Sequence, residues 1–413
     1  MDPTARVTNP RRWAIVGLLF TASLINYFDR ATISFALPLI STELHLGPEA
    51  KGVLLSAFFW SYALMQIPMG VLADRVNLRW LYAGAFTLWS LSQGLIGLAG
   101  GLAALIGFRV LLGIGEAIYL PGGSKIVSLL FQPAERGLPS GLFDAGTRTG
   151  LVIEGVLVPW MLLHFGWRAT FGAVGFAALL WLVPWLLVTP KQLRSAPPVA
   201  GATVTATGFL SGVLELTTNR NLLGVCLAFF CFDYYWYFLV NWLPDYLVTA
   251  RGLTILKAGI YAALPYFVFG ASEPIGGWIA DRLVKRGWSE TRVRKGLVTF
   301  AFLTGLLLIP AARVTSASTA VALIVGGCLV GLATGNLLVI LQNCAPREQI
   351  GLWTGVYNFV GNIAGILSPL VTGLLIDTSG SYATPFMLAA GLIALGPLAL
   401  WLVMRQLPSA QAP

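Results

Sequence analysis

Long apolar runs alternate with short charged breaks along the whole chain, and this pattern predicts helices that cross a membrane. A membrane-spanning helix needs about 20 mostly apolar residues. Twelve such runs lie between breaks of charged residues, Pro and Gly: 13–38, 52–74, 79–99, 102–130, 138–163, 168–189, 222–250, 258–283, 294–313, 318–343, 351–376 and 382–405. The pattern therefore predicts an all-α membrane protein with twelve transmembrane helices.

Composition strengthens this prediction. Of the 413 residues, 57% are hydrophobic and 10% are charged, and the mean hydropathy is +0.78. A soluble domain carries roughly 25% charged residues, so this chain has too little polar surface to face water. The net charge of +9 does not indicate a nucleic-acid partner, because most of the charges fall in short loops between the apolar runs. The lipid bilayer is the predicted environment.

Lys and Arg are distributed unequally between alternate loops. Of the 26 in the chain, 18 lie on the side that includes both termini and five lie on the other side. Cytoplasmic loops carry the excess of Lys and Arg in membrane proteins. We therefore expect a bacterial-type inner-membrane protein with both termini in the cytoplasm.

Residues that build disulfides, metal sites and catalytic sites are sparse. The four cysteines lie inside apolar runs and are interpreted as small core residues, and His45 and His164 are both predicted in loops. The sequence contains no nucleophile–base pair, metal-ligand cluster or phosphate-binding loop. We therefore expect a protein that is not an enzyme and that holds no metal or cofactor.

Three short sequence patterns recur at about half the chain length. Asp74 and Asp281 end similar motifs 207 residues apart, and two later echoes have offsets of 213 and 214. These echoes pair Glu135 with Glu348 and Asp144 with Asn358. Internal repeats of this kind are typical of transporters. We predict two pseudo-symmetric six-helix bundles, 1–189 and 221–413, joined by a cytoplasmic linker at 190–220 and facing each other across a central cavity.

Four motifs resemble those of the major facilitator superfamily. They are Gly70–Arg79 (GVLADRVNLR), Arg109–Ala117 (RVLLGIGEA), Asn26–Arg30 (NYFDR) and Trp242–Tyr246 (WLPDY). The first is similar to the loop 2–3 signature of the superfamily, with Asn77 where glycine is usual. The others are similar to the anion:cation symporter family, which includes bacterial galactonate and glucarate transporters and the animal organic-anion and vesicular glutamate carriers. The resemblance covers nearly the whole chain and implies the major facilitator fold.

Nine ionisable residues lie inside the predicted helices, where each costs at least about 2.5–3.5 kcal/mol on insertion scales. They are Asp29, Arg30, Arg109, Glu116, Asp144, Arg148, Glu154, Asp233 and Glu273. Pairing that locks helices together is the simplest explanation for some of them. The others require a functional reason.

The first and fourth predicted helices carry the candidate coupling group. Arg30 lies at the middle of a polar stripe on the first, and Arg109 and Glu116 lie seven residues apart on one face of the fourth. One interpretation is that these three and Asp29 form a neutral cluster that seals the N-terminal half. The other is a proton switch, because burial and a nearby guanidinium have opposite effects on the proton affinity of a carboxyl group. The resemblance implies that Asp29 and Glu116 carry the coupled protons, and Arg109 is expected to join them. It also implies that Arg30 binds the substrate carboxylate.

Further substrate contacts are expected on several helices. Tyr27, Tyr62 and Asn358 match family positions that line the site, and Thr147 stands where sugar-acid carriers of the family usually have a glutamine. The predicted substrate-binding set is Arg30, Tyr27, Tyr62, Thr147, Arg148, Glu154, Tyr234, Asn358 and Asn362. Arg148 has a second interpretation as the i+4 partner of Asp144. The few amides and many aromatic side chains favour a substrate less hydroxylated than an aldonate.

Two aspartate–arginine pairs, Asp74–Arg75 and Asp281–Arg282, lie at predicted cytoplasmic helix ends. Substrate contact is not expected there. We expect these pairs to form a conformational latch, in which charges act on helix dipoles and hold the two halves in the outward-facing state.

The sequence therefore predicts a monomeric secondary transporter that imports a small organic anion together with protons. A sugar acid, an aromatic acid and a dicarboxylate all fit the predicted site. A proton-driven drug or cation antiporter is the alternative, and the extra acids Glu154, Asp233 and Glu273 favour it. Against it, the fifth predicted helix lacks the Gly-Pro-x-x-Gly-Gly ending typical of antiporters and has Gly155-Val-Leu-Val-Pro159-Trp there instead.

Overall fold

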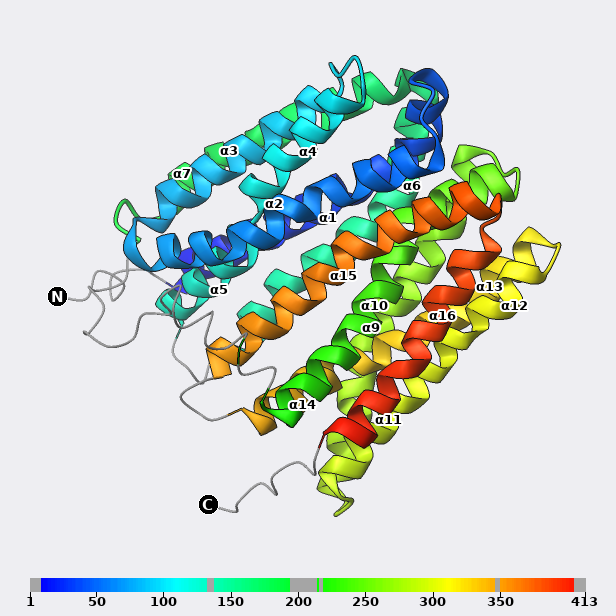
Figure 1. Cartoon of the computed structure of the whole chain (residues 1–413). Coiled ribbons are helices and arrows are strands. Elements are labelled where there is room, and N and C mark those ends of the chain that lie inside the picture. The colour runs from blue at the N-terminus through cyan, green and yellow to red at the C-terminus, as the bar shows by residue number, and fades with distance from the viewer. Residues whose placement is uncertain (1–8, 132–136, 194–213, 215–217, 346–349, 405–413) are drawn as a thin grey trace. The chain divides into compact units, whose positions relative to one another are not determined.

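The computed structural model describes residues 9–131, 137–193, 214, 218–345 and 350–404, and every regular element in these ranges is a helix (Figure 1). The chain divides into two compact units, Met1–Thr203 and Val204–Pro413. The division falls within the predicted linker 190–220, most of which lies outside the described residues. Each unit is described separately below.

The N-terminal unit consists of seven helices in its described part. They are α1 (Asn9–Glu43), α2 (Pro48–Arg75), α3 (Leu78–Ile96), α4 (Leu102–Glu116), α5 (Tyr119–Leu130), α6 (Gly137–Ala178) and α7 (Leu182–Val188). α4 and α5 together make one membrane-length segment, Leu102–Leu130. α6 kinks at Gly166, which has a φ of 73° and a ψ of 169°, a left-handed conformation that glycine adopts without a Cβ clash.

The described part of the C-terminal unit contains the helices α9 to α16. They are α9 (Arg220–Asp245), α10 (Ile255–Lys285), α11 (Glu290–Thr304), α12 (Leu308–Arg313), α13 (Ala317–Gly327), α14 (Thr334–Cys344), α15 (Ile350–Ser379) and α16 (Ala383–Leu398). A 3-10 turn at Gly305–Leu307 joins α11 to α12, and another at Cys328–Ala333 joins α13 to α14. Short π-helical turns follow α9 at Tyr246–Ala250 and α16 at Ala399–Val403.

Eight helices in the described ranges are long and apolar enough to cross a membrane. One of them, Pro139–Val188, is 50 residues long and contains the kink at Gly166, so it holds two of the predicted spans. α1, α2 and α3 are outside that set and have 35, 28 and 19 residues. The described helices thus provide a segment for each of the twelve predicted spans.

Equivalent helices pack together in the two units. In the N-terminal unit α1 lies against α6 and α2 against α4, while in the C-terminal unit α9 lies against α15 and α10 against the Cys328–Ala333 turn. A glycine sets the close approach in each case. A Cβ on Gly113 of α4 would lie 2.4 Å from the carbonyl oxygen of Phe58 on α2, and a Cβ on Gly331 would lie 2.5 Å from that of Phe269 on α10.

Candidate functional site

Helix α1 places a row of polar side chains inside the N-terminal unit. Asn26 and Asp29 are 0% exposed and Arg30 is 7% exposed, although most of the helix surface is apolar. Residues three and four apart share one face of a helix, so Asn26 and Arg30 point the same way. The neighbouring helices α2, α3, α4 and α6 supply the partners of this row.

An ion pair joins α1 to the end of α4. The Nε atom of Arg30 lies 2.7 Å from Oε2 of Glu116, and Nδ2 of Asn26 donates to the same oxygen over 2.7 Å. Glu116 is fully buried and is the last residue of α4. Its other oxygen, Oε1, makes no hydrogen bond within the described part of the chain. The carboxylate of Glu116 is therefore held at one oxygen by two donors from α1.

Asp29 makes its hydrogen bonds with α3. The indole Nε1 of Trp89 donates to its Oδ2 over 3.0 Å, and Nε2 of Gln93 donates to its backbone oxygen over 3.2 Å. Electrostatic interactions link Asp29 to both Glu116 and Arg109. The two predicted proton-coupling acids thus belong to one buried group, with different hydrogen-bond partners.

Arg109 lies in the same group but makes fewer polar contacts. It is 1% exposed, and its Nε and Nη1 atoms make no hydrogen bond with the described residues. Its guanidinium carbon lies 5.0 Å from the ring centroid of Phe58, and it interacts electrostatically with Glu116 and Asp29. An aromatic face attracts a guanidinium, so Phe58 partly replaces the missing hydrogen bonds.

Aromatic rings surround the guanidinium of Arg30. Its Cζ atom lies 4.3 Å from the ring centroid of Tyr62, 4.7 Å from that of Phe58 and 5.0 Å from that of Tyr27. The guanidinium carbon of Arg148 lies 5.8 Å from the ring centroid of Tyr27. Four of the predicted substrate-binding residues are therefore close together: Tyr27, Arg30, Tyr62 and Arg148.

The remaining candidates on α6 have different surroundings. The hydroxyl of Thr147 donates to the backbone oxygen of Asp144 over 2.7 Å, and Tyr119 donates to Oδ1 of Asp144 over 3.3 Å. Glu154 is fully buried, and its polar neighbours are Thr32 and Asp29 of α1. A direct contact of Glu154 with substrate stays a prediction, because the described conformation buries its carboxyl group against α1.

In the C-terminal unit the predicted contacts lie on α9 and α15. Tyr234 is 3% exposed, and its backbone oxygen accepts a hydrogen bond from Ser368 of α15 over 3.1 Å. Nδ2 of Asn362 donates to the backbone oxygen of Asn358 over 2.9 Å. The structure places these three on packed helices of one unit. Their substrate contacts stay a prediction.

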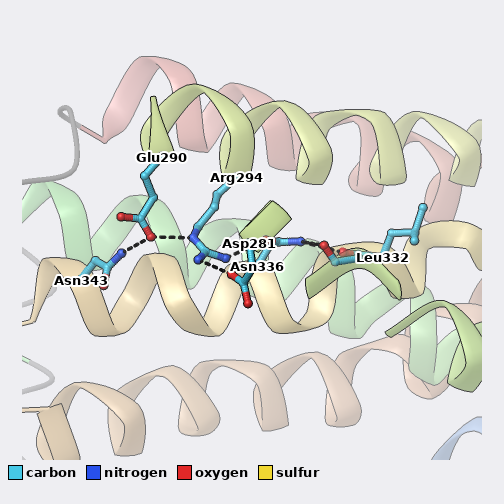
Figure 2. Close-up of polar contacts among 7 residues, drawn as sticks. Asp281, Glu290, Arg294, Leu332, Asn336 and Asn343 are labelled. Carbon is cyan, nitrogen blue, oxygen red and sulfur yellow. Dashed lines mark hydrogen bonds and ion pairs between the residues drawn. The ribbon is translucent and has the colours of Figure 1, made fainter. Parts of the chain in front are cut away.

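The predicted latch residues have local partners. Oδ1 of Asp281 lies 2.9 Å from Nη2 of Arg294 on α11, and Nε of Arg294 lies 2.8 Å from Oε1 of Glu290 (Figure 2). Arg282 instead places its guanidinium 5.1 Å from the ring centroid of Trp278. Arg75 is exposed at the end of α2. The side chain of Asp74 lies outside the described part of the structure.

The network around Arg294 was not predicted. Arg294 also donates to Oδ1 of Asn336 over 3.1 Å, and Nδ2 of Asn343 donates to Oε1 of Glu290 over 2.9 Å; Figure 2 marks both contacts with dashed lines. Nδ2 of Asn336 donates in turn to the backbone oxygen of Leu332 over 3.0 Å. The sequence did contain a signal, because Asn336 is an amide inside a predicted span and Glu290 and Arg294 have i,i+4 spacing.

The site also contains partners on α1, α2 and α3 that sequence reasoning did not select. They are Asn26, Phe58, Trp89 and Gln93. The described residues contain no group of three or more His, Cys, Asp or Glu placed to hold a metal ion. The site is therefore built from carboxylates, guanidinium groups and aromatic rings.

Comparison with known proteins defines the class. The model of the Major Facilitator Superfamily matches residues 19–369, so the chain belongs to this superfamily and is a multi-pass membrane transporter, not an enzyme. A bacterial homologue of the human lysosomal transporter Spinster, solved in an inward-facing and unoccupied conformation, has the same fold. It aligns with a TM-score of 0.74 and 20% identity, over 95% of this chain and 94% of that one.

Particular relatives are transporters of named sugar acids. The chain is 34% identical over 407 residues to the probable galactarate/D-glucarate transporter GudP of Bacillus subtilis, covering 92% of this chain and 89% of that protein. It is 29% identical over 404 residues to the probable L-galactonate transporter of Escherichia coli K12, covering 94% of this chain and 88% of that protein.

Proposed function

We propose that this protein is a proton-coupled symporter that imports a small organic anion of the sugar-acid class. The names of its relatives support the substrate class, since galactarate, D-glucarate and L-galactonate all carry carboxylates. The buried guanidinium of Arg30, surrounded by Tyr27, Phe58 and Tyr62, supports a site for such a carboxylate. Guanidinium suits this task because its planar fork binds a carboxylate through two donors and stays charged.

The observation that carries the proposal is the 2.7 Å contact between Arg30 and Glu116. A substrate carboxylate is chemically equivalent to the carboxylate of Glu116, so the two compete for Arg30. When Glu116 takes up a proton, it loses its charge and its strong attraction to the guanidinium. The contact between Glu116 and Arg30 then weakens, and the substrate carboxylate can take the place of Glu116. Proton binding and substrate binding therefore favour each other, and the linkage must be reciprocal.

The charges of the cluster support the same coupling. Asp29 and Glu116 balance Arg30 and Arg109 when both acids are ionised. An added anion would leave a net negative charge in a buried, low-dielectric site, where uncompensated charge is costly. Uptake of a proton together with the anion keeps the group neutral. Symport of an anion with protons follows from this balance.

We further propose a monomer in a bacterial inner membrane with both termini in the cytoplasm. The 18-to-5 distribution of Lys and Arg between the two sides of the predicted topology supports the orientation of the termini. A reporter enzyme that is active only in the periplasm, fused after residue 405, is expected to be silent. Activity at that position would mean an odd number of spans and would contradict the two-bundle topology.

Transport in proteoliposomes tests the proposal. Labelled D-glucarate is expected to accumulate when the outside is more acidic than the inside, and to equilibrate without accumulating when a protonophore removes the gradient. Protein-free liposomes serve as the control. Accumulation that continues in the presence of the protonophore would contradict proton coupling. Accumulation only with the opposite gradient would favour the antiporter.

A preliminary substrate screen makes the uptake assay informative. Aldarates, aldonates, aromatic acids and dicarboxylates are added to the detergent-purified protein, and the melting temperature is measured. A ligand that binds only the folded protein increases the free energy of unfolding by RT ln(1 + [L]/Kd), and the melting temperature rises as a result. We expect the aldarates to give the largest shift. The absence of a shift with every one of these anions would contradict the proposed substrate class.

A further inference from the structure

Glu154 is a buried acid that has no role in the transport cycle proposed above. It lies on α6 at the contact with α1 and is 0% exposed. Glycines one and two turns earlier set this contact. A Cβ on Gly146 would lie 2.3 Å from the backbone oxygen of Phe20, and a Cβ on Gly150 would lie 2.5 Å from that of Leu24. The next position of this stripe is Glu154, so a carboxyl group occupies a place where the helices pack closely.

The neighbouring hydroxyl suits a protonated carboxyl group. Thr32 lies close enough to Glu154 for its hydroxyl to favour an ionised carboxylate by donating to it, but in the described geometry that hydroxyl donates to the backbone oxygen of Phe28 over 2.7 Å. The hydrogen of Thr32 is therefore already used, and the hydroxyl presents lone pairs to Glu154. Neither oxygen of Glu154 makes a hydrogen bond with the described residues. Only a carboxyl group that carries a proton has a donor to offer to Thr32.

The charged groups around Glu154 do not compensate a negative charge. Asp29 on α1 interacts with it electrostatically and is itself an acid. On α1 and α4, Arg30 is bound to Glu116 at 2.7 Å, and Arg109 interacts with Glu116, Asp29 and Arg30. On α5 and α6, Tyr119 bonds to Asp144, and Arg148 lies at the Tyr27 ring. On α3, Trp89 and Gln93 contact Asp29. An ionised Glu154 would thus be a buried charge beside another acid, which is strongly disfavoured.

We propose that Glu154 is a third proton-carrying carboxyl group of the transport cycle, connected to Glu116 through Asp29. This inference rests on the proposed proton-coupled symport. After Glu116 and then Asp29 have released their own protons, the proton leaves an oxygen of Glu154, is taken by the ionised carboxylate of Asp29 and leaves by the same route through Glu116. Oδ1 of Asp29 makes no hydrogen bond with the described residues, while its Oδ2 accepts from Trp89. Asp29 interacts electrostatically with Glu116 as well. The cycle therefore carries one more proton per substrate than Asp29 and Glu116 alone would carry.

The proton-to-substrate ratio tests this directly. Labelled D-glucarate uptake and internal acidification, followed with an entrapped pH dye, are measured on the same proteoliposomes. Glu154→Gln has the shape of a protonated glutamate and cannot release a proton, so the ratio is expected to fall by one proton. The matched control is Glu49→Gln, the same change at an exposed residue in the first turn of α2, which is expected to keep the wild-type ratio. An unchanged ratio in Glu154→Gln would overturn the proposal.

A measurement without substrate separates this inference from the proposed function. Infrared spectra of the purified protein at neutral pH are expected to contain a carboxyl C=O band from protonated Glu154. The band should be absent from Glu154→Gln and present in Glu49→Gln. If wild-type protein does not accumulate D-glucarate, symport of that substrate fails, and the spectra still decide whether Glu154 holds a proton. Identical spectra for wild type and Glu154→Gln would overturn the inference. Glu154→Asp, which keeps a titratable group, is expected to retain a protonated band and serves if the glutamine variant does not fold.

Discussion

In the N-terminal unit Arg79 of α3 donates to the backbone oxygens of Leu186 and Thr189 at the end of α7, each over 2.7 Å. In the C-terminal unit Lys295 of α11 donates over 2.7 Å to the backbone oxygen of Leu400, in the π-helical turn after α16. The offsets are similar, since 295 − 79 is 216 and 400 − 186 is 214. A cation that satisfies the last carbonyls of a helix is favourable in both electrostatic and hydrogen-bonding terms. Both units therefore have this hydrogen bond from a basic side chain to the last carbonyls of a helix, and such contacts at helix ends are called helix-end ties below.

The opposite helix ends are also tied in both units. In the N-terminal unit Glu43, the last residue of α1, accepts from Trp167 and Arg168 at the kink of α6. In the C-terminal unit Asp245, the last residue of α9, accepts from Tyr382 just before α16. Residue 382 is 214 positions after residue 168. The donors differ, but in each unit an acid at the end of the first helix accepts hydrogen bonds from side chains at the start of the sixth predicted membrane span.

The interiors of the units differ far more than the ends. The N-terminal unit buries Asp29, Arg30, Arg109, Glu116 and Glu154 between its helices. The corresponding part of the C-terminal unit buries one acid, Asp233, among aromatic side chains. Phe229 stacks on Tyr357 with ring centroids 3.6 Å apart, and Trp236 stacks on Phe269 at 3.9 Å. The comparison indicates that both units keep the ties at their helix ends, while the proposed proton-carrying acids all belong to the N-terminal unit.

The largest expected effect comes from Arg30→Lys. An ammonium group cannot reproduce the guanidinium fork, and a hydrogen bond to a charged group contributes about 1.5–3 kcal/mol, roughly 10- to 150-fold in Kd. Binding of D-glucarate by purified protein is expected to weaken by that factor. Arg294→Lys is the matched control in the C-terminal unit. It should lower the melting temperature and leave the Kd near that of the wild type. If Arg30→Lys binds as tightly as the wild type, Arg109 and Arg148 become the candidate anchors.

The next effect concerns coupling and is tested with Glu116→Gln. Glutamine mimics the protonated carboxyl group and does not titrate, so the pH dependence of substrate affinity should disappear. Couplings of this kind are typically about 5- to 150-fold. Gradient-driven uptake is expected to collapse, while counterflow on the same proteoliposomes continues. Asp233→Asn, a buried acid of the C-terminal unit, is expected to keep gradient-driven uptake. Loss of both activities in Glu116→Gln would favour the structural-cluster interpretation.

Much of the fold and part of the site followed from the sequence. Apolar run length located the helices, since a membrane requires a segment of fixed length. Helical spacing placed Arg109 and Glu116 on one face of α4, and the structure brings that face to Arg30. These predictions succeeded because each depends on a single helix or on the high cost of burying a charge without an opposite charge beside it.

The missing parts depend on how helices rotate against one another. Trp89 and Gln93 reach Asp29 only because α3 turns one particular face toward α1, and no local pattern fixes that rotation. The partner of Asp281 likewise depends on packing between helices. Asp281 bonds to Arg294, 13 residues later, because α11 folds back beside the end of α10. Tertiary packing decides such contacts.

The helix-end ties should affect stability more than transport. Arg79→Met and Lys295→Met keep much of the side-chain volume and remove the donors, at a cost of about 1.5–3 kcal/mol for each hydrogen bond that involves a charge. For units of about 200 residues, 1 kcal/mol corresponds to roughly 2–4 °C in melting temperature. Arg79→Met is expected to show the larger decrease, because Arg79 makes two such bonds and Lys295 makes one. Kd values for D-glucarate equal to that of the wild type in both variants would agree with a purely structural role for the helix ends. A weakened Kd in either variant would place ligand binding at the helix ends.

The smallest expected effect lies at Glu43, beyond the predicted first span and exposed. Hydrogen bonds from Arg168 and Trp167 lower the pKa of Glu43 from its ordinary value of 4.5. Because the folded pKa is lower than that of the unfolded chain, the ionised carboxylate stabilises the fold above pH 4.5, and this contribution is lost as the pH falls through the lowered value. Wild type should therefore melt slightly above Glu43→Gln at neutral pH, and the two melting curves should converge in acid. Glu49→Gln, which changes an exposed carboxylate of α2, is expected to lose melting temperature in acid to the same extent as the wild type. If the gap between wild type and Glu43→Gln stays constant down to the lowest pH at which the protein remains folded, then the tie between α1 and α6 does not depend on the charge of Glu43.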